Sequence, residues 1–149
     1  DLLKPGGLMK IALYSELARQ HIVEVRKKIT LLRIGTSKSE IREFRRSLVE
    51  SNDKNHHRLT KSNDFFNLSA LRDLIFHVQE HRFTLLQIKS CLDELGLKFC
   101  GFENKDTISN FRGFHGKDAD IYDLALWHQY EESNPHAFAE MYQFWCQKL

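Results

Sequence analysis

The apolar residues of this 149-residue chain follow two kinds of pattern. Residues 8–13 are nearly all apolar and follow a Pro-Gly-Gly turn at residues 5–7, which predicts a strand buried on both faces of a sheet. A second strand is predicted at residues 97–102, directly after Gly96. Elsewhere apolar positions recur every three or four residues, as in a helix with one buried face. The pattern predicts a mostly helical α/β fold with two principal strands.

Capping residues mark where several predicted helices begin. Ser37 with Glu40, and Thr84 with Gln87, each have the spacing of a capping box, and Ser69 is expected to cap a further helix. The predicted apolar stripes, in chain order, are Ala18, Ile22, Val25, Ile29 and Leu32; Ile41, Phe44 and Leu48; Leu71, Leu74, Ile75 and Val78; and Leu85, Ile88, Leu92 and Leu95.

Between and after these helices the pattern is weaker. Residues 51–63 are polar almost throughout, which predicts a loop and makes this segment the best candidate for disorder. Helices are predicted near residues 108–111 and 121–128. Asn134 and Pro135 then have the order of an N-cap and a first-turn proline, which predicts a final helix. Its stripe would be Phe138, Met141, Tyr142 and Trp145.

Composition adds a prediction of cellular location. No apolar run approaches the length of a membrane span and the first residues carry no signal-peptide pattern, so no membrane partner is expected. The three cysteines are widely separated, without zinc-ribbon or redox spacing. We expect them to be reduced and mostly buried, as in a cytoplasmic protein.

Charge is unevenly distributed along the chain. Residues 16–50 hold nine Lys and Arg against five Asp and Glu, whereas residues 103–149 hold four against eight. The basic segment includes Arg42, Arg45 and Arg46 on one predicted helix face, without interleaved aromatic residues. A solvated face explains such a pattern better than a nucleic-acid interface does, so no nucleic-acid partner is assigned.

Several segments carry a family resemblance. LLKPGGLMKIALYS at residues 2–15 resembles the helix end, turn and fifth strand of class I S-adenosylmethionine-dependent methyltransferases. The remaining segments are similar to a bacterial group of these enzymes, some of which are fused to tetratricopeptide repeats. They are residues 64–66 (DFF), 71–84 (LRDLIFHVQEHRFT), 92–102 and 141–148 (MYQFWCQK).

The resemblance implies the C-terminal part of a Rossmann-like methyltransferase domain that starts in mid-fold. Residues 1–15 would be a turn and strand, 16–80 a helical insertion or lid, 81–102 a helix and strand, and 103–149 a helical tail. The implied cofactor is S-adenosylmethionine, and the methyl acceptor is not identified. The sequence lacks the glycine-rich loop and acidic residue with which such enzymes hold the cofactor. This chain alone is therefore expected to be inactive and prone to self-association through open strand edges.

Two candidate site residues follow the first strand. Tyr14 and Ser15 stand at its carboxyl end, where open α/β sheets bind ligands. Tyr14 is predicted to contact cofactor or substrate, and Ser15 the cofactor.

Further candidates lie in residues 73–82. The resemblance implies that His77 and Glu80 are catalytic and that Asp73, His81 and Arg82 contact substrate. His77 is the natural proton acceptor, because imidazole titrates near neutral pH.

Three other interpretations stay open. His77, Glu80 and His81 match the H-x-x-E-H zinc pattern, but no second motif supplies a third ligand, so no metal is assigned. The same residues are also compatible with ordinary packing and hydrogen bonding. Finally, the whole chain is compatible with a non-catalytic helical protein-interaction module.

Overall fold

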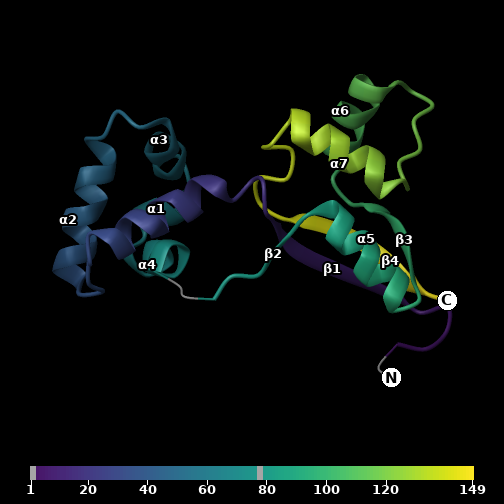
Figure 1. The fold of residues 1–149 in the computed structure, drawn as a ribbon, viewed down its shortest axis with the longest axis horizontal. Coiled ribbons are helices and arrows are strands. Elements are labelled where there is room, and N and C mark those ends of the chain that lie inside the picture. Colours follow the sequence, from purple (N-terminus) through teal and green to yellow (C-terminus); the bar gives the residue numbers. More distant parts are fainter. Residues whose placement is uncertain (1–2, 77–78) are drawn as a thin grey trace. The chain divides into compact units, whose positions relative to one another are not determined.

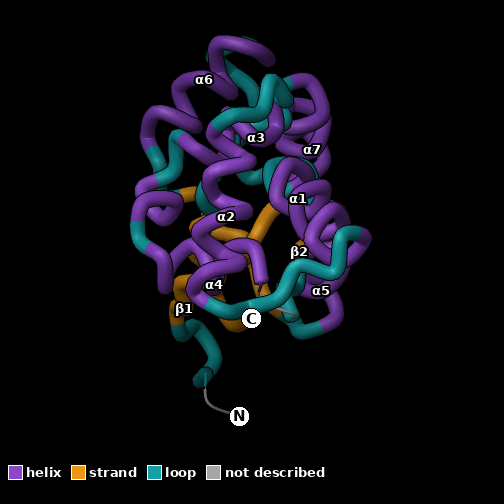
Figure 2. The backbone as a smooth tube through the Cα atoms, turned by 90° about the vertical axis from the view of Figure 1, so that its left-hand side faces the viewer, coloured by secondary structure: helices purple, strands orange, loops and turns teal. Residues whose placement is uncertain are grey.

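The computed structural model of the chain describes residues 3–76 and 79–149. These residues form an α/β fold with seven α-helices, one short 3₁₀ helix and a mixed four-stranded sheet (Figures 1 and 2). The chain divides into two compact units. The first comprises Asp1–Ala18 and His81–Leu149, and the second is Arg19–Glu80.

The first unit contains the whole sheet. Its elements are β1 (Leu8–Ser15), β2 (Arg82–Phe83), α5 (Leu85–Glu94), β3 (Leu97–Phe102), α6 (Lys105–His115), α7 (Leu124–Ser133) and β4 (Tyr142–Lys148). The strand order is β2-β1-β4-β3. β4 runs antiparallel to both β1 and β3. β2 runs parallel to β1 and pairs only with the last two residues of β1, Tyr14 and Ser15.

One face of this sheet builds an aromatic core with α5, α6 and α7. Tyr142, Phe144 and Cys146 of β4 point into it, and the Trp127 ring of α7 stacks on Phe111 of α6 with centroids 3.9 Å apart. The opposite face of β4 carries Trp145, which is 40% exposed. Burial of the large aromatic side chains is the main force that holds the three helices on the sheet.

Both predicted strands are confirmed, but the prediction that the first is buried on both faces is wrong. β1 contains the predicted residues 8–13 and continues to Ser15, and β3 has the predicted bounds. In β1 only Ser15 is buried, because the core of the first unit covers one face of the sheet and Ile11 and Leu13 are only partly buried against it.

The predicted helical tail is wrong at its end. Asn134 is the residue that ends α7, and the segment after it is a series of turns that leads into β4. Side chains of residues 142–148 alternate between the two faces of the sheet. This segment forms a strand instead of the predicted helix because β4 pairs with both β1 and β3 and lies between them.

The second unit is entirely helical in its described residues. It contains α1 (Gln20–Leu31), α2 (Lys38–Val49), α3 (Lys54–Thr60), the 3₁₀ helix η1 (Asn63–Phe66) and α4 (Leu68–Phe76). Both predicted capping boxes of the chain are confirmed, at α2 in this unit and at α5 in the first. The core of the second unit consists of Ile22, Val25, Ile29, Ile41, Phe44, Leu48, Leu59, Phe65, Leu71 and Ile75.

Three predictions for this unit are wrong. Residues 51–63 are mostly helical rather than a loop, because Asp53 caps α3 and its His56 and Leu59 are buried one turn apart. The cap of α4 is Asn67 instead of Ser69: its side chain accepts hydrogen bonds from the backbone of residues 69 and 70. The sequence spacing of Asp73, His77 and Glu80 also predicts one polar face on the helix that begins near residue 69. This is wrong for Glu80, which lies outside any described helix, since the described part of α4 ends at Phe76.

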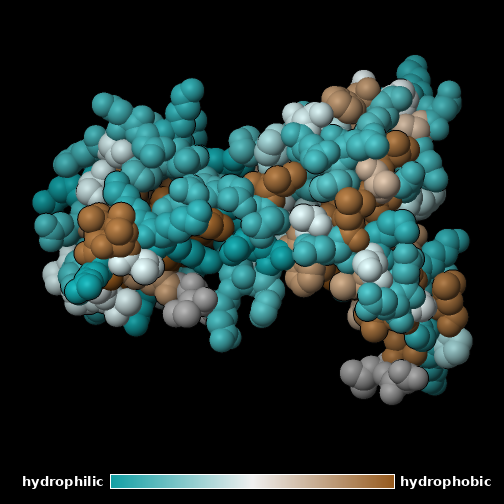
Figure 3. All heavy atoms as spheres, viewed as in Figure 1, coloured by the Kyte–Doolittle hydropathy of each residue, from teal (hydrophilic) through white to brown (hydrophobic). Residues whose placement is uncertain are grey.

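The surface in Figure 3 is mainly hydrophilic, with separate hydrophobic patches. No helix of the described residues is long and apolar enough to cross a membrane. All three cysteines are free, but only Cys146 is buried; Cys91 is exposed and Cys100 is half-buried, so the expectation that most are buried was wrong.

Candidate functional site

The candidate site lies at one edge of the sheet in the first unit. β1 and β3 both run antiparallel to β4, so they are parallel to each other. Their carboxyl ends, at Ser15 and Phe102, therefore lie at the same end of the sheet, where β4 begins with Tyr142. This end of the sheet, as distinct from its outermost strands, is the edge at which the candidate site lies. Open α/β sheets bind ligands outside the carboxyl ends of their strands.

A buried hydrogen-bond network holds this edge together. The Ser15 hydroxyl donates to Glu131 Oε1 on α7 at 2.5 Å, and the Tyr142 hydroxyl lies 2.9 and 2.7 Å from the two Glu131 oxygens. Ser15 also accepts a hydrogen bond of 3.0 Å from the backbone of Ala18. Ser15, Glu131 and Tyr142 have no exposed surface, so the network lies in the protein interior.

Burial controls the electrostatics of this network. It raises the pKa of Glu131, and the hydrogen bonds from Ser15 and Tyr142 and the nearby His128 offset it only in part. Burial also raises the pKa of Tyr142, and the Glu131 charge adds to the effect. His128 Nδ1 is buried and has no hydrogen-bond partner among the described residues. The network therefore ties β1, α7 and β4 together around one satisfied carboxyl group.

Sequence reasoning missed Glu131 and Tyr142. Neither follows a recognisable motif, and Ser15 is 116 residues from Glu131. Ser15 itself was predicted to contact the cofactor. Its hydroxyl faces the interior, and a cofactor contact stays a prediction.

Tyr14 and Arg82 lie side by side at the same edge. They are partners in the β1–β2 register, and both are half-buried. Arg82 Nε donates to Glu16 Oε2 at 3.0 Å. The structure thus brings two of the predicted substrate residues together, with a carboxylate beside them.

The other predicted site residues are distributed differently. Asp73 is exposed on α4, and Glu80 lies at the end of the second unit. His81 is exposed and belongs to the first unit. His77 lies outside the described residues.

Glu80 forms the best-defined ion cluster of the second unit. Its carboxylate lies 2.5 Å from Arg19 Nη2 and 3.0 Å from Arg26 Nη2, and its side chain is 6% exposed. Burial favours a higher pKa for Glu80, but the hydrogen bonds and charges of the two arginines outweigh it, and the pKa is lowered. Glu80 is held as an anion in this arrangement, and its role as a general base stays a prediction.

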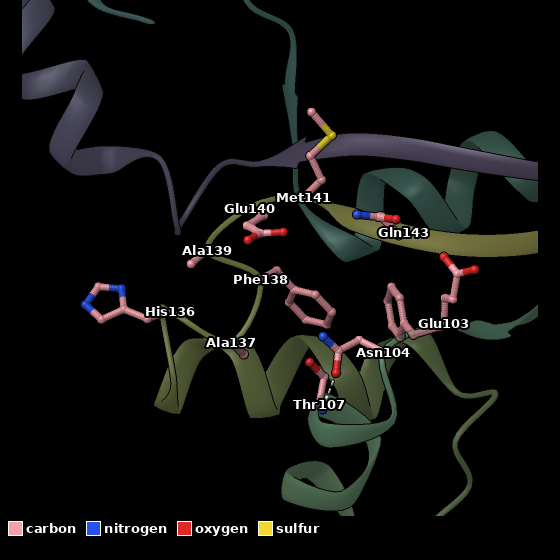
Figure 4. Close-up of a pocket in the computed structure, with 11 residues that line it drawn as sticks. Glu103, Asn104, Thr107, His136, Ala137, Phe138, Ala139, Glu140, Met141 and Gln143 are labelled. Atoms are coloured by element: carbon pink, nitrogen blue, oxygen red, sulfur yellow. Dashed lines mark hydrogen bonds between the residues drawn. The ribbon is translucent and has the colours of Figure 1, made fainter. Parts of the chain in front are cut away.

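A pocket of about 380 Å³ lies beside the end of β3 (Figure 4). The first residues after β3, the start of α6 and the segment leading into β4 form its walls. The lining residues are Phe102, Glu103, Asn104, Thr107, His136, Ala137, Phe138, Ala139, Glu140, Met141 and Gln143. Phe138 contacts the Tyr142 ring at 4.8 Å between centroids, so the pocket wall adjoins the buried network.

The connections that follow β1 and β3 do not fit a whole S-adenosylmethionine molecule. β1 leads into α1 through residues 16–19, and β3 leads into α6 through residues 103–104, both without glycine. Neither connection provides the close backbone approach of a glycine-rich loop. Within residues 3–76 and 79–149, no group of three or more His, Cys, Asp and Glu side chains is arranged to hold a metal ion.

Comparisons with known proteins name no relative. No protein-family model matches the chain, and no curated protein matches its sequence.

Proposed function

We propose that this chain is the C-terminal part of an S-adenosylmethionine-dependent methyltransferase of Rossmann-like fold, and that it forms the acceptor side of the cleft. The methyl acceptor is not identified. Residues outside this chain would hold most of the cofactor, because the chain lacks a glycine-rich loop after its strands.

One observation carries this proposal: the carboxyl ends of two parallel strands meet at one edge, next to a pocket. The order strand, helix, parallel strand, given by β1, α5 and β3, is the order that the family resemblance implies. β1 is also the strand whose sequence carries the Pro-Gly-Gly signature of that resemblance. The antiparallel β4 is compatible with it, since mixed sheets are common in α/β folds.

In this proposal the chain positions the acceptor. Tyr14 and Arg82 present a ring and a guanidinium at the sheet edge, where they would orient the acceptor. Ser15, Glu131 and Tyr142 are positioning residues, because they are buried and act only by fixing the ends of β1, α7 and β4. Accurate alignment of two reactants is a large part of the catalysis of group transfer.

Calorimetric titration of S-adenosylhomocysteine tests the proposal. The probe would be added to a longer polypeptide that includes the coding sequence upstream of Asp1, and to residues 1–149 alone. We expect saturable binding by the longer polypeptide only. Absence of binding by a folded longer polypeptide would reject the methyltransferase proposal in favour of the interaction module.

Variants at the sheet edge refine the test. Tyr14→Ala in the longer polypeptide is expected to weaken methyl transfer from labelled S-adenosylmethionine to acceptors in a cell extract. Leu95→Ala is the control, because Leu95 is 60% exposed and lies beside the amino end of β3, which begins at Leu97, instead of the carboxyl end. Equal transfer by both variants would remove Tyr14 from the site.

A further inference from the structure

We propose that the pocket beside β3 binds a small organic cation, an ammonium group carried on an apolar body. The pocket lies entirely within the first unit, between the end of β3, the start of α6 and the segment before β4. Its volume of about 380 Å³ is within the usual range for small-molecule sites. This is the same pocket that supports the proposed function, but the inference is argued from the charge and chemistry of its lining alone, so its test can fail without rejecting methyl transfer.

The charge of the lining selects a cation. Two carboxylates line the pocket, Glu103 and Glu140. Glu103 is already neutralised by an ion pair with Lys10 of β1. Glu140 has no hydrogen-bond or ion-pair partner among the described residues, and in Figure 4 its carboxylate points into the space between Phe138 and Gln143. Glu140 is exposed to solvent, so its charge is partly screened, and as the unpaired carboxylate of the lining it attracts a positive group.

The lining contains no cation that competes for this carboxylate. His136 is the only basic residue among the lining residues, and in Figure 4 its ring points away from Glu140. An anionic ligand would meet Glu140 without a compensating arginine or lysine in the pocket wall. The arrangement therefore discriminates by charge sign.

The remaining surface suits an apolar body with one polar substituent. Phe138 and Phe102 form the apolar wall, with rings 4.7 Å apart, and Met141 contributes a flexible thioether side chain. The Asn104 side chain uses its oxygen to cap α6, and its amide nitrogen has no partner among the described residues. That amide can donate to a hydroxyl or carbonyl of the ligand.

Benzylamine, benzyl alcohol and benzoate are probes of one shape and three charge states. Each would be titrated into ¹⁵N-labelled protein comprising residues 1–149, with the side-chain amide signals of Asn104 and Gln143 as local reporters. We expect saturable shifts with benzylamine, at least tenfold weaker binding of benzyl alcohol, and none of benzoate. Benzoate binding as tightly as benzylamine, or no shift of either amide with benzylamine, would overturn the inference.

Glu140→Gln isolates the carboxylate. Because the substitution preserves size, we expect it to weaken benzylamine binding about tenfold and leave benzyl alcohol binding unchanged. Glu132→Gln is the matched control, because Glu132 is also in the first unit and exposed but does not line the pocket. The affinity of this variant for benzylamine should equal that of the unsubstituted protein. The dispersion of the amide spectrum verifies that each variant is folded. Unchanged benzylamine affinity in a folded Glu140→Gln variant would show that the proposed cation site does not exist.

Discussion

The Ser15 hydroxyl and the Glu131 carboxyl group are joined by a hydrogen bond of 2.5 Å across 116 residues of sequence. This bond fastens the end of β1 to α7, and Tyr142 extends it to the start of β4. A buried polar group of this kind stabilises the fold only while all its partners are present. The candidate site edge therefore depends on three side chains that a ligand does not touch.

Tyr142→Phe tests the network. The variant leaves the ring in the core but removes the hydroxyl that serves both Glu131 oxygens. We expect the free energy of unfolding to fall by about 1–3 kcal/mol, the usual cost of an unsatisfied buried polar group. Urea unfolding monitored by tryptophan fluorescence measures this loss, because Trp127 and Trp145 both lie in the first unit. Tyr122→Phe, at an exposed position, should change the value by less than about 0.5 kcal/mol.

Glu131→Gln tests the raised pKa of Glu131. Below the ordinary glutamate pKa of about 4.3, the carboxyl group is protonated in both folded and unfolded protein. As the pH rises, the unfolded chain ionises first, so the unsubstituted protein loses stability until the raised folded pKa has been passed. The variant lacks this loss. The difference in unfolding free energy between the two proteins should therefore shift in favour of the variant as the pH rises, and parallel pH curves would contradict the assignment.

Glu80→Gln should destabilise the second unit and reduce its acid sensitivity. The lowered pKa of Glu80 means that its ion pairs stabilise the unit above the ordinary glutamate pKa and lose that effect as the pH falls through the folded value. Near neutral pH we expect the free energy of unfolding to fall by about 1–3 kcal/mol. Urea unfolding monitored by the helical circular dichroism signal measures this loss. Asp73→Asn, on an exposed face of the same unit, is the control. An effect of Asp73→Asn as large as that of Glu80→Gln would argue against a special role for the Arg19–Glu80–Arg26 cluster.

Residues 1–149 alone should self-associate and should not bind S-adenosylmethionine. In the described structure β1 pairs with β2 only at Tyr14 and Ser15, so the backbone of Leu8–Leu13 has no strand on that side. Such an edge is open to pairing with a second copy. Light scattering should detect species larger than the monomer, and calorimetry should detect no saturable binding. A strictly monomeric chain that binds the cofactor at micromolar concentration would contradict both expectations.

The predictable parts of the fold are those with local signals. β1 follows a Pro-Gly-Gly turn and β3 follows Gly96, whose φ of +60° suits a residue without a side chain. Ser37 and Thr84 mark helix starts with capping boxes that need only four consecutive residues. These choices are made within one turn of chain, so the sequence alone reveals them.

β4 could not be predicted in the same way. Its aromatic residues fit a helical stripe as well as an alternating strand, and Asn134-Pro135 supplied a false helix start. The strand is selected by its pairing with β1, more than 125 residues away in sequence for the pair Leu13 and Tyr142. The same holds for Glu131, whose importance arises only when β1 and β4 meet at α7.

The central position of β4 has a consequence for biosynthesis. Because translation delivers residues 142–148 after β1 and β3, a nascent chain carries two strands that lack the one that joins them. The sheet of the first unit is completed only when β4 has left the ribosome, while the helical unit of residues 19–80 can fold much earlier. A ribosome that stalls before Tyr142 would therefore expose unpaired strands, and such nascent chains should be preferred clients of chaperones.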